Sequence, residues 1–229
     1  MSVEKEILIN GYTHVLYKSE AYTAAESIAK SEAFYNWIDT RRSVREYSSQ
    51  PIAKSVIENI IKSASTAPSG AHKQPWTFCA ISNEELKTQM RLAAEVEERE
   101  TYAKRMSDRW RADLAPLGTD TNKPFIEDAP WVIVAFKRVY EHEDNVKHNN
   151  YYVNESIGIA CGMLISAIHN AGLVTLTHTP SPMNFLAKLL ERPSNERAFL
   201  LLPIGYPKHP AYVPDLNRKD LDEVAVFYE

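Results

Sequence analysis

Hydrophobic residues along the chain change their spacing several times, and these changes predict alternating helices and strands. Apolar positions from Ile57 to Ala64 recur at i, i+3, i+4 and i+7, which predicts an amphipathic helix from Val56 to about Thr66. Further helices are predicted over residues 86–105, 156–171 and 185–190, and strands over residues 76–81, 131–136, 173–179 and 199–204. This alternation is typical of an α/β or α+β domain with large helices against a modest sheet.

Two of these segments carry more apolar residues than a half-exposed element needs. Residues 131–136 form a continuous apolar run behind Pro130, which predicts a strand covered on both faces. Residues 156–171 are apolar nearly all round, which predicts a buried central helix. Gly158 and Gly162 would lie on one face of this helix and would allow another helix to approach closely.

Charge replaces hydrophobicity in the second half of the helix predicted over residues 86–105. From Glu95 to Arg105 this helix has little to bury, so we expect a lid or a partner surface there. Residues 1–35 are less patterned and are expected to form an arm, whereas residues 213–219 are extended and polar before a short apolar end. No repeat, low-complexity stretch or Gly/Ser linker divides the chain, which favours a single domain.

Composition narrows the classes of function. The 229 residues are 44% hydrophobic and 24% charged with a net charge of −4, which is typical of a soluble globular protein and unfavourable for nonspecific nucleic-acid binding. The seven glycines include no G-x-G-x-x-G, G-x-x-x-x-G-K-[ST] or G-x-S-x-G arrangement. The usual dinucleotide fingerprint, the P-loop and the hydrolase nucleophile elbow are therefore absent. A nucleotide-like cofactor would have to be held by side chains.

The cysteines and the N-terminal sequence indicate the cellular compartment in which the protein is expected. Cys79 and Cys161 each lie in an apolar run, which predicts buried thiols rather than a disulfide or a metal pair. The charged start of the chain lacks the apolar core of a signal peptide, and no segment approaches the roughly 18 apolar residues of a spanning helix. We therefore expect a cytoplasmic protein.

Two short segments offer polar chemistry. Residues 41–45 place three arginines beside Ser43, which suits a phosphate or carboxylate, although a solvated basic turn is an equal alternative. The turn at residues 68–72 could bring backbone N–H groups close to a ligand through Gly70, or could be an ordinary turn. Ser69 and His72 lie on that one tight turn with no acidic residue to orient the histidine, so a hydrolase is rejected.

Glu98, Tyr102 and Lys123 form a third candidate set. Glu98 and Tyr102 are four residues apart and would share a helix face, and with Lys123 they could hold the ammonium and carboxylate of an amino acid. The competing interpretation is a charged helix face in water. His142 and His148 stand among acidic residues, where a surface loop is favoured over a metal site; no metal ligand set is predicted.

Taken together, these segments resemble the nitroreductase superfamily of FMN enzymes. The charged insert 95–106, Lys123 and the tail 214–219 are similar, within that superfamily, to the iodotyrosine deiodinase family. The similarity covers roughly residues 35–226. The segments that carry it at the superfamily level are Arg41–Arg45, Thr66–His72, Gln74–Phe78, Ala160–Gly162, Asn170–Thr175 and Leu202–Pro207.

The resemblance implies an architecture and an assembly. The fold would be α+β and three-layered, with a central, mainly antiparallel sheet flanked by helices. Residues 1–34 would form an N-terminal arm or helix, and residues 35–229 a single FMN domain with a lid insert at about residues 84–123. The chain would form an obligate homodimer with FMN at the subunit interface and a C-terminal arm exchanged between subunits.

The resemblance also assigns residues by position. Thr179 would be the catalytic residue, with its hydroxyl near flavin N5. Glu98, Tyr102 and Lys123 would hold the zwitterion of a halotyrosine, and the Ala71 backbone N–H would receive its phenolate oxygen. The expected FMN-binding residues are Arg41, Arg42, Ser43, Val44, Arg45, Ser69, Gly70, Thr177, His178, Thr179 and Arg218.

The implied activity is reductive dehalogenation of mono- and diiodotyrosine to tyrosine and iodide, by stepwise electron transfer from the reduced flavin. An NAD(P)H-linked system would supply the electrons, directly or through another protein. Two alternatives stay open: a nitroreductase or quinone reductase of broad specificity, and a flavin-binding module without turnover. Neither a nucleic acid nor a membrane is an expected partner.

Overall fold

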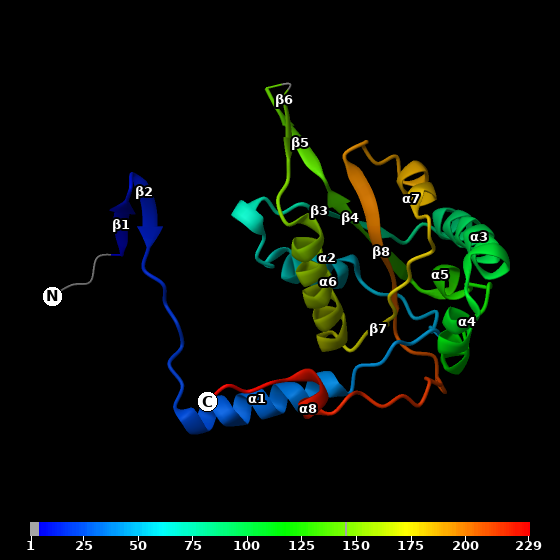
Figure 1. Cartoon of the computed structure of the whole chain (residues 1–229), viewed down its shortest axis with the longest axis horizontal. Helices are drawn as coiled ribbons and strands as arrows, with labels where there is room; N and C mark the ends of the chain where they lie inside the picture. The colour runs from blue at the N-terminus through cyan, green and yellow to red at the C-terminus, as the bar shows by residue number, and fades with distance from the viewer. Residues whose placement is uncertain (1–4, 145) are drawn as a thin grey trace. The chain divides into compact units, whose positions relative to one another are not determined.

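The computed structural model describes residues 5–144 and 146–229, and the chain divides into two compact units, Met1–Thr40 and Arg41–Glu229 (Figure 1). The larger unit contains a four-stranded sheet in the order β3-β4-β8-β7, and every strand pairing in it is antiparallel. Its strands are β3 (Trp76–Ile81), β4 (Trp131–Arg138), β7 (Val174–Thr175) and β8 (Glu196–Gly205). The predicted α+β class with a mainly antiparallel sheet is confirmed.

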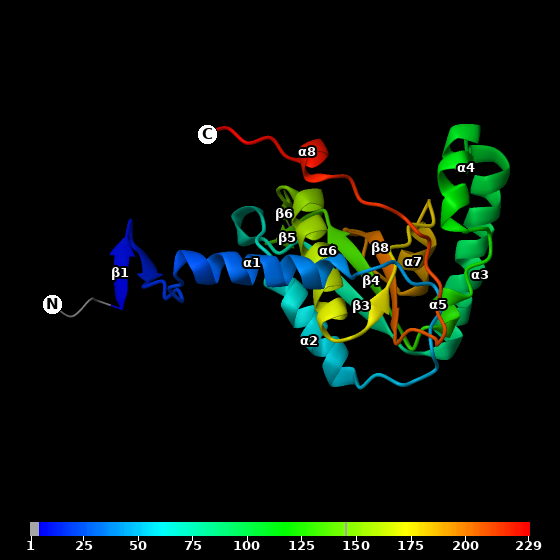
Figure 2. The same ribbon diagram turned by 90° about the horizontal axis from the view of Figure 1, so that it is seen from below.

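Helices cover both faces of this sheet, as the two views in Figures 1 and 2 show. On one face lie α2 (Lys54–Ser65) and α6 (Val153–Asn170). On the other lie α3 (Glu84–Glu100), α5 (Phe125–Asp128) and α7 (Asn184–Leu189). The alternation of β4 explains the three layers, because Val132 and Val134 pack toward α3 and α5 whereas Ile133 packs toward α2 and α6. Each such side chain contributes about 1.5–3 kcal/mol by burial.

The interpretation of helix 156–171 as buried on all sides is wrong. In α6, Leu164 and Ile168 are fully buried, but Ile159 is 47% exposed. A Cβ added at Gly158 or Gly162 would meet no atom within 4 Å. Part of the apolar surface of this helix is therefore not covered by the described part of its own chain.

Two other predictions differ from the structure. The strand predicted over residues 173–179 is paired only at Val174–Thr175, and beyond this point His178 alone returns to the sheet, through a bridge to Leu201. The favoured surface loop around residues 142–148 is a hairpin of β5 (Tyr140–Glu143) and β6 (Val146–Asn149). Polar strands without a buried face give no alternating hydrophobic signal, which explains the second difference.

The lid region, residues 84–123, is more structured than its charge suggested. After α3, a π-helical turn η2 (Thr101–Arg105) leads into α4 (Asp108–Leu114) and the 3₁₀ turn η3 (Ala115–Leu117). The expectation that residues from 95 onward have little to bury is wrong for Glu95, which is 7% exposed and ion-paired.

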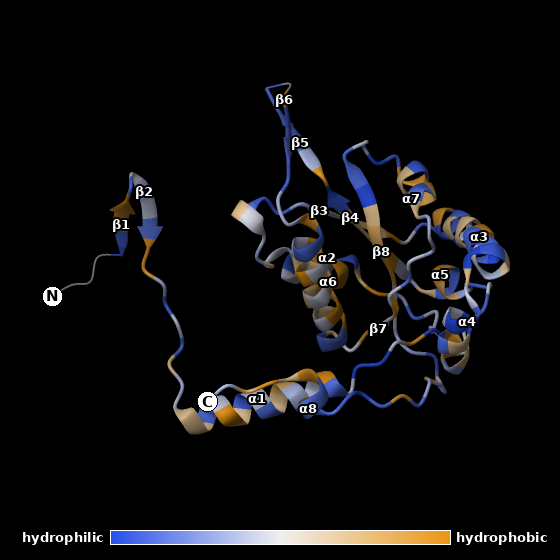
Figure 3. Ribbon diagram, viewed as in Figure 1, coloured by the Kyte–Doolittle hydropathy of each residue, from blue (hydrophilic) through white to orange (hydrophobic). Residues whose placement is uncertain are grey.

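The chain ends contain short elements that the sequence pattern missed. The smaller unit has the hairpin β1 (Glu6–Ile9) and β2 (Tyr12–Val15), followed by α1 (Ala24–Asp39), which starts with a Thr23/Glu26 capping box. The apolar residues of α1 alternate with polar ones around the helix (Figure 3), and none of them is buried. The tail after β8 is extended up to the one-turn helix α8 (Leu221–Val224).

The domain boundary expected after residue 34 stays a prediction, although α1 continues through it. Among the described residues, no helix is both long and apolar enough to cross a membrane.

Candidate active site

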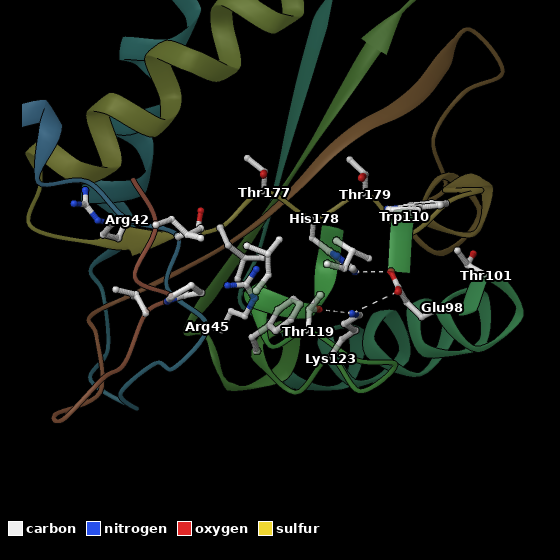
Figure 4. A pocket seen from close by; sticks show the side chains of 18 of the residues that line it. Arg42, Arg45, Glu98, Thr101, Trp110, Thr119, Lys123, Thr177, His178 and Thr179 are labelled. Atoms are coloured by element: carbon white, nitrogen blue, oxygen red, sulfur yellow. Dashed lines mark hydrogen bonds and ion pairs between the residues drawn. The ribbon is translucent and has the colours of Figure 1, made fainter. Parts of the chain in front are cut away.

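A pocket of about 590 Å³ lies in the larger unit (Figure 4). Four stretches of sequence line it: the segment 41–45, the lid with Lys123, the segment 176–181 after β7, and the tail 213–218. The residues predicted from the sequence that line this pocket are Arg41, Arg42, Ser43, Arg45, Glu98, Tyr102, Lys123, Thr177, His178, Thr179 and Arg218. Stretches separated by more than a hundred residues are thus brought to one cavity.

Arginines gather at one end of the pocket. Arg218 donates a hydrogen bond to the Arg41 carbonyl at 3.1 Å, which ties the tail to the segment 41–45. Burial lowers the pKa of Arg41, and the positive charges of Arg218 and Arg42 lower it further. The buried Nε of Arg45 has no hydrogen-bond partner among the described residues. Crowded guanidinium groups with an unused donor are suited to an anion such as a phosphate.

The sheet fixes the position of this basic segment. The Val44 N–H donates to the Thr175 carbonyl at 3.2 Å, and the Tyr47 hydroxyl donates to the Val44 carbonyl at 2.9 Å. Val44 itself is 6% exposed, so it anchors the segment while its arginine neighbours reach the pocket. The segment is therefore held on the sheet and is not a freely solvated turn.

Glu98, Tyr102 and Lys123 meet at the opposite, lid side of the pocket. Lys123 Nζ lies 3.4 Å from Glu98 Oε2 and 3.1 Å from Thr119 Oγ1, and it also donates to the Asp120 carbonyl. The Tyr102 hydroxyl donates to the Thr119 carbonyl at 3.1 Å. Lys123 is 3% exposed, so the competing interpretation of a charged face in water does not hold.

Burial dominates the titration of this pair. It raises the pKa of the Glu98 carboxyl even though Lys123 opposes the shift, and it lowers the pKa of the Lys123 ammonium even though Glu98 opposes it. Glu98 and Lys123 are held in a shielded pocket. Each of them could leave its partner and bind the opposite charge of a zwitterionic ligand.

Glu95, a residue that the sequence reasoning did not single out, anchors Lys123. Its Oε1 accepts the Lys123 backbone N–H at 2.9 Å, and Arg91 Nη1 donates to both of its oxygens at 3.1 and 3.2 Å. Arg91 Nε also pairs with Glu127 Oε2 at 2.5 Å. The sequence carried a signal for the first pairing, because Arg91 and Glu95 are four residues apart on a helix.

Exposed and buried side chains alternate along the segment 177–179. Thr177 and Thr179 are exposed, whereas His178 between them is buried. The His178 N–H donates to the Leu201 carbonyl at 2.9 Å and its carbonyl accepts from the Leu201 N–H at 3.0 Å. The His178 ring packs edge-on against Phe125 with 5.3 Å between centroids. Burial, aided by the charges of Lys123 and Arg45, lowers the pKa of His178 to about 3.

Four predicted site residues do not line this pocket: Val44, which is buried against the sheet, and Ser69, Gly70 and Ala71. Ser69 Oγ accepts the Gln74 N–H at 2.9 Å, and a Cβ at Gly70 would come within 2.8 Å of the Tyr152 ring. Ala71 adopts a left-handed backbone with φ of 48°. Such a conformation costs about 1 kcal/mol or more in a residue other than glycine and is common at ligand sites.

The sequence reasoning missed an apolar wall of the pocket. Met106, Trp110, Leu114 and Leu117 line it from the lid. Their spacing of four, four and three residues is helical, so the pattern was present in the sequence but was hidden among charges. Within residues 5–144 and 146–229, no group of His, Cys, Asp and Glu side chains could hold a metal ion.

Comparison with known proteins identifies the family. The sequence profile of the nitroreductase family matches residues 38–206. Iodotyrosine deiodinase of Haliscomenobacter hydrossis is 56% identical over 213 residues, which cover 93% of this chain and 96% of that protein. The chain belongs to the iodotyrosine deiodinase family.

Other members of the iodotyrosine deiodinase family support this assignment. Human iodotyrosine deiodinase 1 is 43% identical over 215 residues, covering 93% of this chain and 74% of that protein. A crystal structure of oxidized iodotyrosine deiodinase bound to FMN and 3-iodo-L-tyrosine has a TM-score of 0.75 at 29% identity, covering 85% of this chain and 98% of that chain. The three-layer nitroreductase fold is thereby confirmed.

Proposed function

We propose that this protein is an FMN-dependent iodotyrosine deiodinase. The observation that carries the proposal is a single pocket with clustered arginines at one end and a buried Glu98/Lys123 pair at the other. The unused buried Nε of Arg45 and the crowding around Arg41 fit a flavin with a terminal phosphate. Arg41, Arg42, Ser43, Arg45 and Arg218 would hold FMN in this pocket, with Thr177 and Thr179 beside its ring.

Substrate recognition would use both members of the buried pair. The substrate ammonium would bind Glu98, its carboxylate would bind Lys123, and Tyr102 would close over the amino-acid end. The apolar lid wall at Trp110 would cover the aromatic ring and exclude water. A ligand without the zwitterion would leave two buried charges without a substrate partner, which makes the site selective for amino acids.

The overall reaction consumes two electrons and one proton: the carbon–iodine bond breaks, iodide leaves, and a carbon–hydrogen bond forms. Bound FMN supplies the electrons one at a time. Thr179 would be the catalytic residue and would present its hydroxyl hydrogen to flavin N5, and the Ala71 N–H would hold the substrate phenolate oxygen. These roles of the protein are positional and electrostatic.

A homodimer would complete the site. The described chain places Ser69, Gly70 and Ala71 outside the pocket, so a second copy would supply them. Exposed apolar residues on α1, α6 and the C-terminal tail are the surfaces such a dimer would bury, with the tail exchanged between subunits. They include Ile28, Phe34, Tyr35, Ile159, Leu221, Val224, Val226 and Phe227.

We further propose a source of electrons and a cellular compartment for this reaction. An NAD(P)H-linked reductant, acting directly or through another protein, would return the flavin to its reduced form. Cys79 and Cys161 are free thiols, which is consistent with a reducing cytoplasm.

The test compares two activities of the purified holoprotein with dithionite as reductant. Release of iodide from 3-iodotyrosine should be much faster than reduction of a nitroarene. Rapid nitroarene reduction without iodide release would instead indicate a nitroreductase of broad specificity. A protein that binds FMN but turns over neither compound would indicate a flavin-binding module.

A further inference from the structure

His178, which the family resemblance places beside FMN, carries a buried side-chain nitrogen to which no role has been assigned. Its Nε2 is shielded from solvent and has no hydrogen-bond partner among residues 5–144 and 146–229, and it lies 4.0 Å from Glu98 Oε1 (Figure 4). The backbone of His178 is fixed to Leu201 on both sides, and its ring is held against Phe125. Leaving a buried polar atom unsatisfied destabilises the folded protein, so the presence of this atom beside the proposed substrate site needs an explanation.

The Glu98 carboxylate uses its two oxygens unequally. Oε2 faces Lys123 Nζ at 3.4 Å, whereas Oε1 receives no hydrogen bond within the described part of the chain. If a zwitterion binds as proposed, Lys123 turns to the substrate carboxylate, and the substrate ammonium takes its place at Glu98 Oε2. Oε1 of this poorly solvated carboxylate is then still without a donor.

We infer that His178 is a positioning residue that holds Glu98 in the substrate-bound state, by donating its Nε2–H to Glu98 Oε1. This inference rests on the proposed function. A shift of roughly 1 Å would bring the 4.0 Å separation to hydrogen-bond distance. Burial, together with the positive charges of Lys123 and Arg45, lowers the pKa of the imidazole and keeps it neutral, so it does not compete with the substrate ammonium for Glu98.

The test uses two substitutions that differ in where they place an amide. The amide nitrogen of His178→Gln reaches the position of Nε2, whereas that of His178→Asn reaches only the position of Nδ1. Affinities for 3-iodotyrosine and for 2-iodophenol, which lacks the zwitterion, are measured in the holoprotein by quenching of flavin fluorescence. His178→Asn should weaken iodotyrosine binding by about tenfold, and His178→Gln by less than about threefold. The affinity for iodophenol should be the same in all three proteins.

Equal iodotyrosine affinity in His178→Asn and the unsubstituted protein would overturn the inference, as would equal weakening for both ligands. Failure of the unsubstituted protein to bind iodotyrosine would instead overturn the proposed function. A second measurement uses the unsubstituted protein, so it does not depend on whether the variants fold. In holoprotein with ¹⁵N-labelled histidine, iodotyrosine should shift the Nε2–H resonance of His178 downfield, and iodophenol should not. An unchanged resonance would contradict the inference.

Discussion

Among single residues, the proposed amino-acid recognition depends most on the Glu98 carboxylate. We predict that Glu98→Gln weakens 3-iodotyrosine binding by about tenfold to a hundredfold, because a hydrogen bond to a charged group contributes about 1.5–3 kcal/mol. FMN content should not change, because Arg42 of the arginine cluster lies on the side of the pocket away from Glu98 (Figure 4). Titration of flavin fluorescence measures both quantities.

Glu100→Gln is the matched control for this substitution. Glu100 lies two residues further along the chain, is 45% exposed and pairs with Lys104 at 2.9 Å on the surface. Its substitution should leave iodotyrosine affinity unchanged. Equal losses in the two variants would mean that the carboxylate at residue 98 has no special role.

The buried histidine at the same site predicts a pH dependence of stability. His178 has a pKa of about 3 when folded and an ordinary value of 6.5, so below pH 6.5 the unfolded state binds a proton that the folded state does not. Stability conferred by the neutral ring is therefore lost as the pH falls. Between pH 7 and pH 5 this loss is about 2 kcal/mol.

His178→Gln removes that titration and serves as the comparison. Urea unfolding of the two holoproteins at saturating FMN should give a free-energy difference that shifts in favour of the variant by about 1–2 kcal/mol between pH 7 and pH 5. Parallel pH profiles would show that the imidazole is not held neutral in the folded protein.

At the scale of elements, the lid is connected to α3 through Glu95. We predict that Glu95→Ala lowers the free energy of unfolding by about 1–3 kcal/mol, because it leaves the Lys123 N–H and Arg91 without their acceptor. Iodotyrosine affinity should fall with it, since Lys123 loses its backbone anchor. Urea unfolding and fluorescence titration measure the two effects, and FMN affinity is the internal control. Unaltered iodotyrosine affinity would contradict the anchoring role.

Elements with strong periodicity were predictable from the sequence, and those without it were not. The helix beginning near Val56 and the strand over residues 76–81 follow from apolar spacing alone, because each buries a defined face. The β5–β6 hairpin and the short helix α8 bury little, so the pattern carried no signal for them. The end of β7 at Thr175 depends on pairing with β8, which is a long-range property.

At the scale of the whole molecule, the open face of α6 predicts a dimer contact. We predict that Gly158→Leu leaves the fold of one chain intact, because a Cβ there meets no atom of the described residues within 4 Å and leucine favours a helix over glycine by roughly 0.5–1 kcal/mol. The bulk should nevertheless weaken dimerisation and release FMN. Sedimentation equilibrium and the flavin content of the purified protein measure these outcomes.

Asn59→Leu, an exposed position on α2, is the control for added apolar bulk. It should leave the dimer and the FMN content unchanged. A Gly158→Leu protein that remains dimeric with full FMN content would exclude this face from the interface.

The candidate site was predictable only in part, because some of its features depend on tertiary packing or on a second copy of the chain. The family resemblance pointed to Arg41, Glu98, Lys123 and Thr179, and folding of one chain brings them to one pocket, although their roles stay predictions. The burial of the Glu98/Lys123 pair and the support from Glu95 arise from tertiary packing, which no local pattern encodes. The predicted roles of Ser69, Gly70 and Ala71 depend on a second copy of the chain and stay predictions.

An anaerobic single turnover tests whether bound FMN and the zwitterion site together perform reductive deiodination. The reduced holoprotein is mixed with 3-iodotyrosine in the absence of any other reductant, and flavin absorbance, iodide and tyrosine are followed together. We predict that the flavin becomes oxidised while iodide and tyrosine appear in equal amounts, one of each per flavin. A flavin that stays reduced in the presence of bound iodotyrosine would contradict the account.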